Sequence, residues 1–350
     1  MNLRFLSVIG ALTALVLAFT LSSCGVGGSF DPENVVNSVR VLAVRADKPY
    51  AKPGDTVELE MLAVDGRAAK TRPMRTFWLP TICENPADDL YYLCFSTLFS
   101  GGADAGADAS AQGVDAGAFT GRDISAFLVE SPKFSVHLAD NLITSHPVVE
   151  GAPQPYGLAI AFYIACAGHP EIVLPSAASR QSPPIGCFDD TGKQLGPDEY
   201  VIGLSRVYAY EEATNANPVL GVIKYEGKEI DPAVGITIPP CTEDKITDCP
   251  KHKLVADAPA SSQETNPFDQ DVNGNPLREQ VWVSFFTTVG RFGSDQRLLY
   301  DSTAGRVTNG QDVDLFAPNK PNLPTDGRVY LVIKDSRGGT GWIDFPIVSR

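Results

Sequence analysis

The chain has few of the side chains and motifs on which nucleic-acid-binding and zinc proteins depend. Lys and Arg account for only 28 of its 350 residues, against 42 Asp and Glu, and the formal net charge is −14. Binding to phosphate backbones requires clustered positive charge, so this composition excludes a nucleic-acid partner. CxxC is absent, which leaves no indication of a zinc site. The four histidines are scattered: His137, His146, His169 and His252.

Catalytic sequence motifs are missing as well. The chain contains no GxSxG, HExxH, P-loop or GxGxxG. Ser145 and His146 are neighbours in sequence, which says little about the geometry of a triad. Paired acids such as Glu211 and Glu212 are ordinary in so acidic a chain. We therefore expect a non-enzymatic protein. The alternative is a hydrolase or carbohydrate-active protein whose site is assembled from loops.

Long segments of helical period are absent beyond the first residues. The 31 glycines and 27 prolines instead separate short runs in which apolar and polar residues alternate, as in 56–64 (TVELEMLAV). This period of two predicts half-buried strands. In chain order the expected strands are 39–46, 56–64, 74–79, 133–139, 157–166, 200–210, 219–225, 252–256, 279–288, 328–334 and 342–348.

The strand pattern begins again at Asn217-Pro218, and each half carries a tryptophan on a central strand, Trp78 and Trp282. We predict an all-β fold of two tandem immunoglobulin-like (Ig-like) β-sandwich domains, 35–214 and 215–350. In such a sandwich a tryptophan normally packs between the sheets. The blurred alternation at 281–286 leaves the face of Trp282 open.

The N-terminus indicates export. One positive charge, Arg4, precedes an apolar run that ends at Leu21, which is the layout of a signal peptide over 1–23. The following Leu21-Ser22-Ser23-Cys24-Gly25 resembles the lipobox of bacterial lipoproteins, which implies a lipid on Cys24 and a tether over 24–34. Because Gly25 is not Asp, we expect attachment to the outer membrane of the cell envelope. Loss of Arg4 would leave the mature chain with a charge of −15.

Six cysteines remain once Cys24 is set aside, and an even number in an exported protein predicts disulfides. Six cysteines allow 15 connectivities, so any pairing rests on a preference for short loops. That preference selects Cys83 with Cys94, Cys166 with Cys187, and Cys241 with Cys249.

A wider resemblance follows from several motifs taken together. They are the lipobox, ADKPYAKPGDTVEL near residue 50, DLYYLC, CFDDTGKQLGPDEYVIG, TNANPV and KDSRGGTGW. With them the mature chain resembles uncharacterised myxobacterial-type lipoproteins with tandem bacterial Ig-like (PKD-like) domains. The resemblance implies the fold and the membrane anchor. We expect a binding, adhesion or scaffolding module of the cell envelope, with an envelope protein or a glycan as its partner.

Three further segments carry weaker predictions. Asp269, Asp271 and Asn273 reproduce the first half of an EF-hand loop and could hold Ca²⁺, although Gln280 stands where the twelfth-position acid belongs. A polar turn is the favoured alternative. Residues 100–118 are almost entirely Gly, Ala, Asp and Ser, which predicts a disordered insertion. The aromatic residues between 91 and 99 are expected to serve in core packing, with an exposed binding patch as the alternative.

Overall fold

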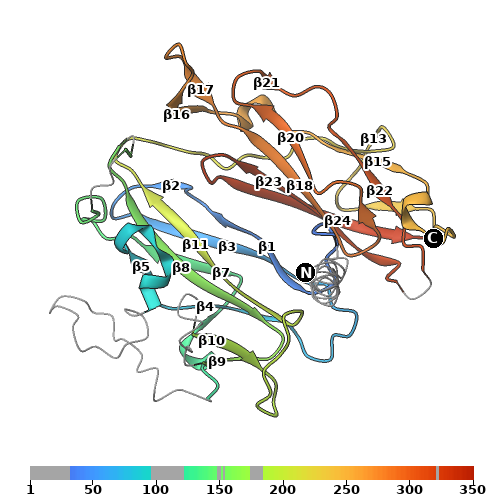
Figure 1. The fold of residues 1–350 in the computed structure, drawn as a ribbon, viewed down its shortest axis with the longest axis horizontal. Coiled ribbons are helices and arrows are strands. Elements are labelled where there is room, and N and C mark those ends of the chain that lie inside the picture. Colours follow the sequence, from blue (N-terminus) through green and yellow to red (C-terminus); the bar gives the residue numbers. More distant parts are fainter. Residues whose placement is uncertain (1–31, 96–121, 148–150, 153, 174–183, 321–322) are drawn as a thin grey trace, which may run out of the picture. The chain divides into compact units, whose positions relative to one another are not determined.

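Strands dominate the part of the chain that the computed structural model describes (Figure 1). The description covers residues 32–350 without 96–121, 148–150, 153, 174–183 and 321–322. Cys24, Phe99 and the 100–118 insertion therefore lie outside the described residues. Within them, no helix is long and apolar enough to cross a membrane.

The first sandwich pairs a small sheet with a larger one. Val57, Leu59 and Met61 of the small sheet point at Trp78 and Ala161 of the large sheet, and all five side chains are buried in one core. The small sheet has the order β1 (Val39–Ala46), β3 (Thr56–Asp65), β7 (Lys133–His137). The large sheet has the order β2 (Tyr50–Ala51), β11 (Tyr200–Ala209), β8 (Gly157–Cys166), β4 (Arg75–Trp78), β6 (Val129–Glu130), and β5 (Cys83–Glu84) also pairs with β8.

The central strand β8 is apolar without alternation because both of its faces are buried. Ala159 and Ala161 face the small sheet, whereas Ile160 and Phe162 face a second apolar cluster. That second cluster contains the Cys83–Cys94 and Cys166–Cys187 disulfides. It is covered by short elements, namely β9 (His169–Ile172), β10 (Ile185–Phe188) and the 3₁₀ turns η1 (Ala87–Asp89), η2 (Tyr91–Leu93) and η3 (Ser125–Phe127).

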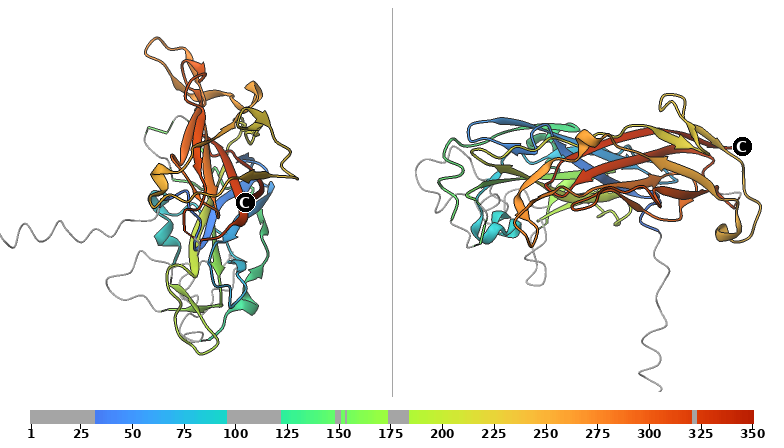
Figure 2. Two further views of the ribbon diagram at one scale, coloured as in Figure 1. Left: turned by 90° about the vertical axis from the view of Figure 1, so that its right-hand side faces the viewer. Right: turned by 90° about the horizontal axis from the view of Figure 1, so that it is seen from above.

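The second sandwich encloses a core formed by residues such as Leu254, Phe285 and Phe345, each fully buried. Its long strands run side by side in both views of Figure 2. One sheet has the order β14 (Ile236–Ile238), β24 (Thr340–Ser349), β23 (Asp326–Asp335), β18 (Val281–Thr287), β20 (Gln296–Asp301), β21 (Gly305–Arg306). The other has the order β13 (Lys228–Glu229), β12 (Ile223–Tyr225), β15 (His252–Ala256), β22 (Asp312–Phe316), β19 (Arg291–Phe292).

Three smaller elements complete the second half. β16 (Thr265–Gln270) and β17 (Pro276–Arg278) form a separate hairpin, and η4 (Ile246–Asp248) and η5 (Ala260–Ser262) are 3₁₀ turns. The third disulfide, Cys241–Cys249, spans η4 at the edge of the second core. The three disulfides are those that the preference for short loops predicts.

The two sandwiches meet through the outer faces of two sheets. Leu42 of β1 and Val64 of β3 pack against Phe286 of β18 and Val332 of β23, in a cluster that also holds Val36. Contacts accordingly group Asn34–Arg350 into a single unit. We call this contact between the outer face of β1–β3 and the outer face of β18–β23–β24 the junction.

The junction explains the blurred alternation at 281–286. Val281, Val283 and Phe285 face the core of the second sandwich, and the residues between them face outward. Phe286 is covered by the first sandwich, so it is apolar although it points away from its own core. Trp282 lies on the same outer face as Phe286, unlike Trp78, which is buried between sheets.

The expected strand at 219–225 is shorter than the sequence indicates, because β12 begins only at Ile223. Before it, Val219 exchanges hydrogen bonds with the Ser262 side chain, and the Gly221 amide donates to the Asp257 carbonyl. Residues 219–222 therefore make backbone hydrogen bonds but do not belong to a strand.

Candidate functional site

A cleft of about 500 Å³ opens where the two sandwiches diverge at one end of the junction. β3 determines its position through its outward-facing residues. Glu58 and Glu60 face the cleft, and two and four positions further on Leu62 and Val64 are packed in the junction. A single strand face thus changes from charged to apolar at the point where the other sandwich covers it.

One wall of the cleft is a row of ion pairs on the small sheet. Arg45 of β1 pairs with Glu60, its direct neighbour on β3. Lys133 of β7 lies 2.8 Å from Glu58, and this contact raises the pKa of the lysine. These side chains are between about a third and a half exposed, so their charges are accessible to a ligand.

The opposite wall is largely apolar. It is formed by Pro218, Val219 and Leu220 of the segment between the sandwiches and by Trp342 and Ile343 of β24. Arg45 closes the inner end, because its guanidinium carbon lies 4.4 Å from the centre of the Trp342 ring. The cleft therefore offers charge on one side and apolar surface on the other.

The segment between the sandwiches is held rigidly against both of them. The Asn217 side chain donates to the carbonyl of Ala46 (2.7 Å) and accepts from the amide of Thr340 (2.8 Å). A β-carbon on Gly341 would lie 2.5 Å from the Pro218 carbonyl oxygen, so close packing of this segment requires glycine there. These contacts fix the apolar wall in place.

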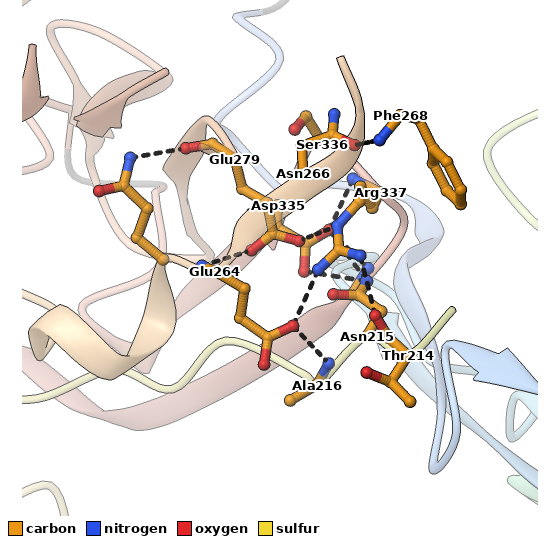
Figure 3. A network of polar contacts seen from close by, with 12 residues as sticks. Thr214, Asn215, Ala216, Glu264, Asn266, Phe268, Glu279, Asp335, Ser336 and Arg337 are labelled. Atoms are coloured by element: carbon orange, nitrogen blue, oxygen red, sulfur yellow. Dashed lines mark hydrogen bonds and ion pairs between the residues drawn. The ribbon is translucent and has the colours of Figure 1, made fainter. Parts of the chain in front are cut away.

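A buried network of hydrogen bonds and ion pairs surrounds Arg337 (Figure 3). It includes residues 214–216, which directly precede the segment of the cleft wall. The Arg337 guanidinium donates to Glu279 (2.5 Å), to Glu264 (2.8 Å) and to the carbonyl of Thr214 (2.8 Å). Its side chain is 3% exposed and that of Glu279 is 1% exposed. One cation therefore holds two carboxylates of the second sandwich and the backbone that leads into the cleft wall.

Asp335 is the third carboxylate of this network. One of its oxygens accepts hydrogen bonds from the amides of Arg337 and Gly339, both at 2.8 Å. Burial raises the pKa of Asp335, and burial likewise raises the pKa of Glu279. The Asn215 side-chain nitrogen lies 3.4 and 3.5 Å from the two Asp335 oxygens.

The glycines of the Gly338-Gly339 turn serve different purposes. A turn between two strands commonly needs a positive φ, which glycine adopts readily, so both glycines of the KDSRGGTGW motif are expected to have one. Gly338 has a φ of +96°, as expected, whereas Gly339 does not have a positive φ. A β-carbon there would instead lie 2.0 Å from an Asp335 carboxylate oxygen, so glycine is needed because that carboxylate packs against the backbone.

Aromatic rings from both sandwiches surround the network on its other side. The Arg337 guanidinium lies 5.4 Å from the centre of the Tyr50 ring, which belongs to β2 of the first sandwich. Phe268 of the β16–β17 hairpin contacts Tyr50 and Tyr210, with centroid distances of 6.0 and 5.3 Å. Arg337 thus contacts both sandwiches.

The residues predicted to hold Ca²⁺ lie in and beside the turn of this hairpin. Asp271 accepts hydrogen bonds from the amides of Asn273 and Asn275, and Asp269 accepts one from Asn266. Among the described residues, no group of three or more His, Cys, Asp or Glu is placed to hold a metal ion. Ca²⁺ at Asp269, Asp271 and Asn273 stays a prediction, and the ion would have to compete with these hydrogen bonds.

His146 borders a second cavity of about 560 Å³. Its Nε2 lies 2.9 Å from Asp89, and its Nδ1 lies 2.7 Å from the carbonyl of Pro147, so both nitrogens face acceptors. The Ser145 hydroxyl bonds to Leu142 and Asn85 instead of to His146. In this arrangement the two neighbours do not form a nucleophile and base.

Other aromatic and acidic residues lie in the core, in a turn or at a cavity. Phe95 is buried, and its ring lies 5.4 Å from that of Phe162, which is the expected use in the core. Asp189 accepts hydrogen bonds from Thr191 and Lys193 within a turn. Glu211 lines the cavity beside His146.

Sequence reasoning missed the charged network because its members are far apart in the chain. Glu264 immediately precedes β16, Glu279 immediately follows β17, and Arg337 lies in the β23–β24 turn, so no spacing rule connects them. The available signal was the presence of Asp335 and Arg337 directly after the largely apolar stretch VYLVIK. Charged residues at the end of a buried strand need oppositely charged or hydrogen-bonding partners.

Comparisons with known proteins do not identify a family for this chain. No family model and no curated protein matches the chain. Among solved structures, the D00–D0 domain of intimin is 10% identical with a TM-score of 0.18, covering 88% of this chain and 100% of that one. Dimeric latent PorU from Porphyromonas gingivalis is 10% identical with a TM-score of 0.20, covering 90% and 24%. Extracellular domains 3–5 of Drosophila OTK are 8% identical with a TM-score of 0.16, covering 91% and 98%. TM-scores of this size do not establish a shared fold.

Proposed function

We propose that this protein is a non-enzymatic binding module of the bacterial cell envelope, and that the cleft at the junction is its ligand site. The observation that supports this most directly is the construction of the cleft. Its charged wall comes from β1, β3 and β7, and its apolar wall comes from β24 and the segment Pro218–Leu220. The Asn217 side chain joins Ala46 of β1 to Thr340 of β24 and so ties the two walls together, which forms the site before any ligand arrives.

The proposed attachment to the envelope is a lipid on Cys24, in the outer membrane because Gly25 is not Asp. Its support is the apolar run followed by Leu21-Ser22-Ser23-Cys24. Each buried methylene of an acyl chain contributes about 0.8 kcal/mol, so two or three chains hold a protein firmly. Metabolic labelling with radioactive palmitate tests this. The label should be incorporated by the wild type and by Ser22→Ala, and lost in Cys24→Ala.

Site-specific photocrosslinking tests the cleft. Val219 lies in the cleft wall and is 54% exposed, and Val234 is 76% exposed on a loop elsewhere in the second sandwich. A photoreactive residue at position 219 in native envelopes should give one defined adduct, which the same residue at 234 should not give. Charge reversal by Glu58→Lys should remove the adduct. Identical adducts from 219 and 234 would contradict the proposal.

A further inference from the structure

The anchoring tether enters the folded protein at the junction. The Asn34 side chain donates to the carbonyl of Phe292 (3.1 Å) and accepts from its amide (3.0 Å), and its backbone pairs with Thr287 of β18. Val36 is buried in the junction cluster. The last residue of the tether and those that follow it, although next to the first sandwich in sequence, are thus fixed to the second. We call this point the tether root.

The tether root and the cleft lie at opposite ends of the junction. Val36 packs against Gly66, where a β-carbon would lie 2.2 Å from the Val36 carbonyl oxygen, and Gly66 follows the C-terminal end of β3. Glu58, at the other end of β3, lines the cleft. Between them β1 and β3 run antiparallel along the whole junction. The first and last residues of β1 are seven steps apart. At about 3.3 Å per step, the two ends of this strand lie roughly 23 Å apart.

The length of the tether limits where a membrane can lie. Nine residues separate Cys24 from Asn34, and ten steps of a fully extended chain span at most about 35 Å. A lipid on Cys24 therefore keeps the tether root within that distance of the bilayer. Turning the cleft towards the membrane would require most of that length to run alongside the junction.

The charges at the two ends favour the same orientation. A cavity of about 340 Å³ beside the tether root is lined by three basic side chains, Arg67, Lys70 and Arg328, and by two acidic ones, Asp65 and Asp326. Arg67 is buried and paired with Asp65, which leaves Lys70 and Arg328 against Asp326 at the surface. The cleft is lined by two basic and three acidic side chains. Anionic lipid repels the chain as a whole, because its net charge is −14. This repulsion is weaker at the tether-root end than at the cleft end, because basic side chains outnumber acidic ones there.

We infer that the tether-root end of the junction faces the anchoring membrane, so that the cleft opens away from it. This inference rests on the proposed lipid attachment at Cys24. The surface that includes the loop Gly66–Lys70 and Thr288 is then the membrane-facing surface. A ligand reaches the cleft from the aqueous side, as a glycan or protein outside that membrane would.

Fluorescence quenching in proteoliposomes tests the orientation. The lipidated full-length protein carries one fluorophore, at Lys70→Cys near the root or at Val219→Cys in the cleft, and the bilayer contains a lipid with a nitroxide headgroup. Both positions are exposed, and the native cysteines among the described residues are paired in disulfides. We expect the nitroxide to quench the label at 70 several-fold more than the label at 219.

A lengthened tether is the matched control. Twenty Gly/Ser residues inserted after Gly25 should reduce the difference between the two labels, because the tether no longer restricts orientation. Equal quenching at 70 and 219 with the native tether, or stronger quenching at 219, would overturn the inference while leaving the anchor intact. Failure of the protein to float with liposomes would refute the anchor, and with it the inference.

Discussion

Arg337 is the residue on which most of the buried charge depends. Its guanidinium lies between Glu279, which is 1% exposed, and Glu264, which is 36% exposed. A buried carboxylate without its partner is costly, whereas an exposed pair contributes little. Loss of the Arg337 cation should therefore cost more stability through Glu279 than through Glu264.

We expect Arg337→Met to lower the free energy of unfolding by about 3–5 kcal/mol, because it leaves Glu279 buried without a cation. Glu264→Gln should cost at most about 1 kcal/mol, since that carboxylate reaches solvent. Urea unfolding of both variants measures the difference. Equal effects would show that burial does not decide the strength of these contacts.

The raised pKa of Asp335 predicts that the free energy of unfolding depends on pH. Burial raises its folded-state pKa above the unfolded value, so the folded protein binds the proton more tightly. The stabilisation is complete below about pH 4, the usual range of Asp, and is lost as pH rises through the folded-state value. Glu279 shifts in the same direction, and Arg337, Asn215 and Glu264 are the other polar groups nearby.

Asp335→Asn should remove the contribution of Asp335 to this dependence because an amide cannot ionise, while the contribution of Glu279 remains. Relative to the variant, wild-type protein should be most stable near pH 4 and lose that advantage towards pH 7. Urea unfolding of both proteins across this range gives the comparison. Parallel profiles would mean that Asp335 does not change its protonation on folding.

At the scale of elements, the β16–β17 hairpin combines a contact with the first sandwich and the predicted Ca²⁺ ligands. Phe268 at its base packs on Tyr50 and Tyr210. At its tip, Val272 is fully exposed, in a turn held by Asp271. The tip is thus presented to solvent in a turn that these hydrogen bonds hold.

A Ca²⁺ ion in this turn would raise the melting temperature of the protein, because a ligand that binds only the folded state stabilises it. Thermal unfolding in millimolar Ca²⁺ and in chelator tests the prediction, with Asp269→Ala as the variant that should abolish the shift. Asp271→Ala is a poor choice, since it also removes hydrogen bonds of the turn. An unchanged melting temperature would leave Asp271 with a purely structural role.

At the scale of the whole molecule, the junction determines whether the two sandwiches unfold together. Val64 and Val332 are both buried there, outside either sandwich's own core. We expect Val64→Asp to separate the two sandwiches because it places a charge against an apolar sheet. Calorimetry should then show two transitions in place of one.

Val64→Ala is the control for this prediction. It removes apolar contacts without adding charge, and should lower stability by about 1–2 kcal/mol while a single transition remains. A single transition in Val64→Asp would show instead that neither sandwich is stable without the other. In that case the rigid cleft would depend on cooperative folding of the entire chain.

Several features of the fold could be predicted because they depend on local pattern. Alternation located β1 and β3, the expected strand at 157–166 matches β8, and short loops selected the three disulfides. The elements that escaped prediction are short, such as β2 and β19, which have two residues each and no period to detect.

The sequence by itself determined the longer alternating strands, such as β3, and which side of them is apolar, since both follow from a period of two. Only the tertiary structure decided what covers the outward side. Leu62 and Glu60 occupy equivalent positions on the outer face of β3, yet one is packed in the junction and the other lines the cleft. The difference arises from the second sandwich, whose contacts with β3 join residues more than 200 positions apart.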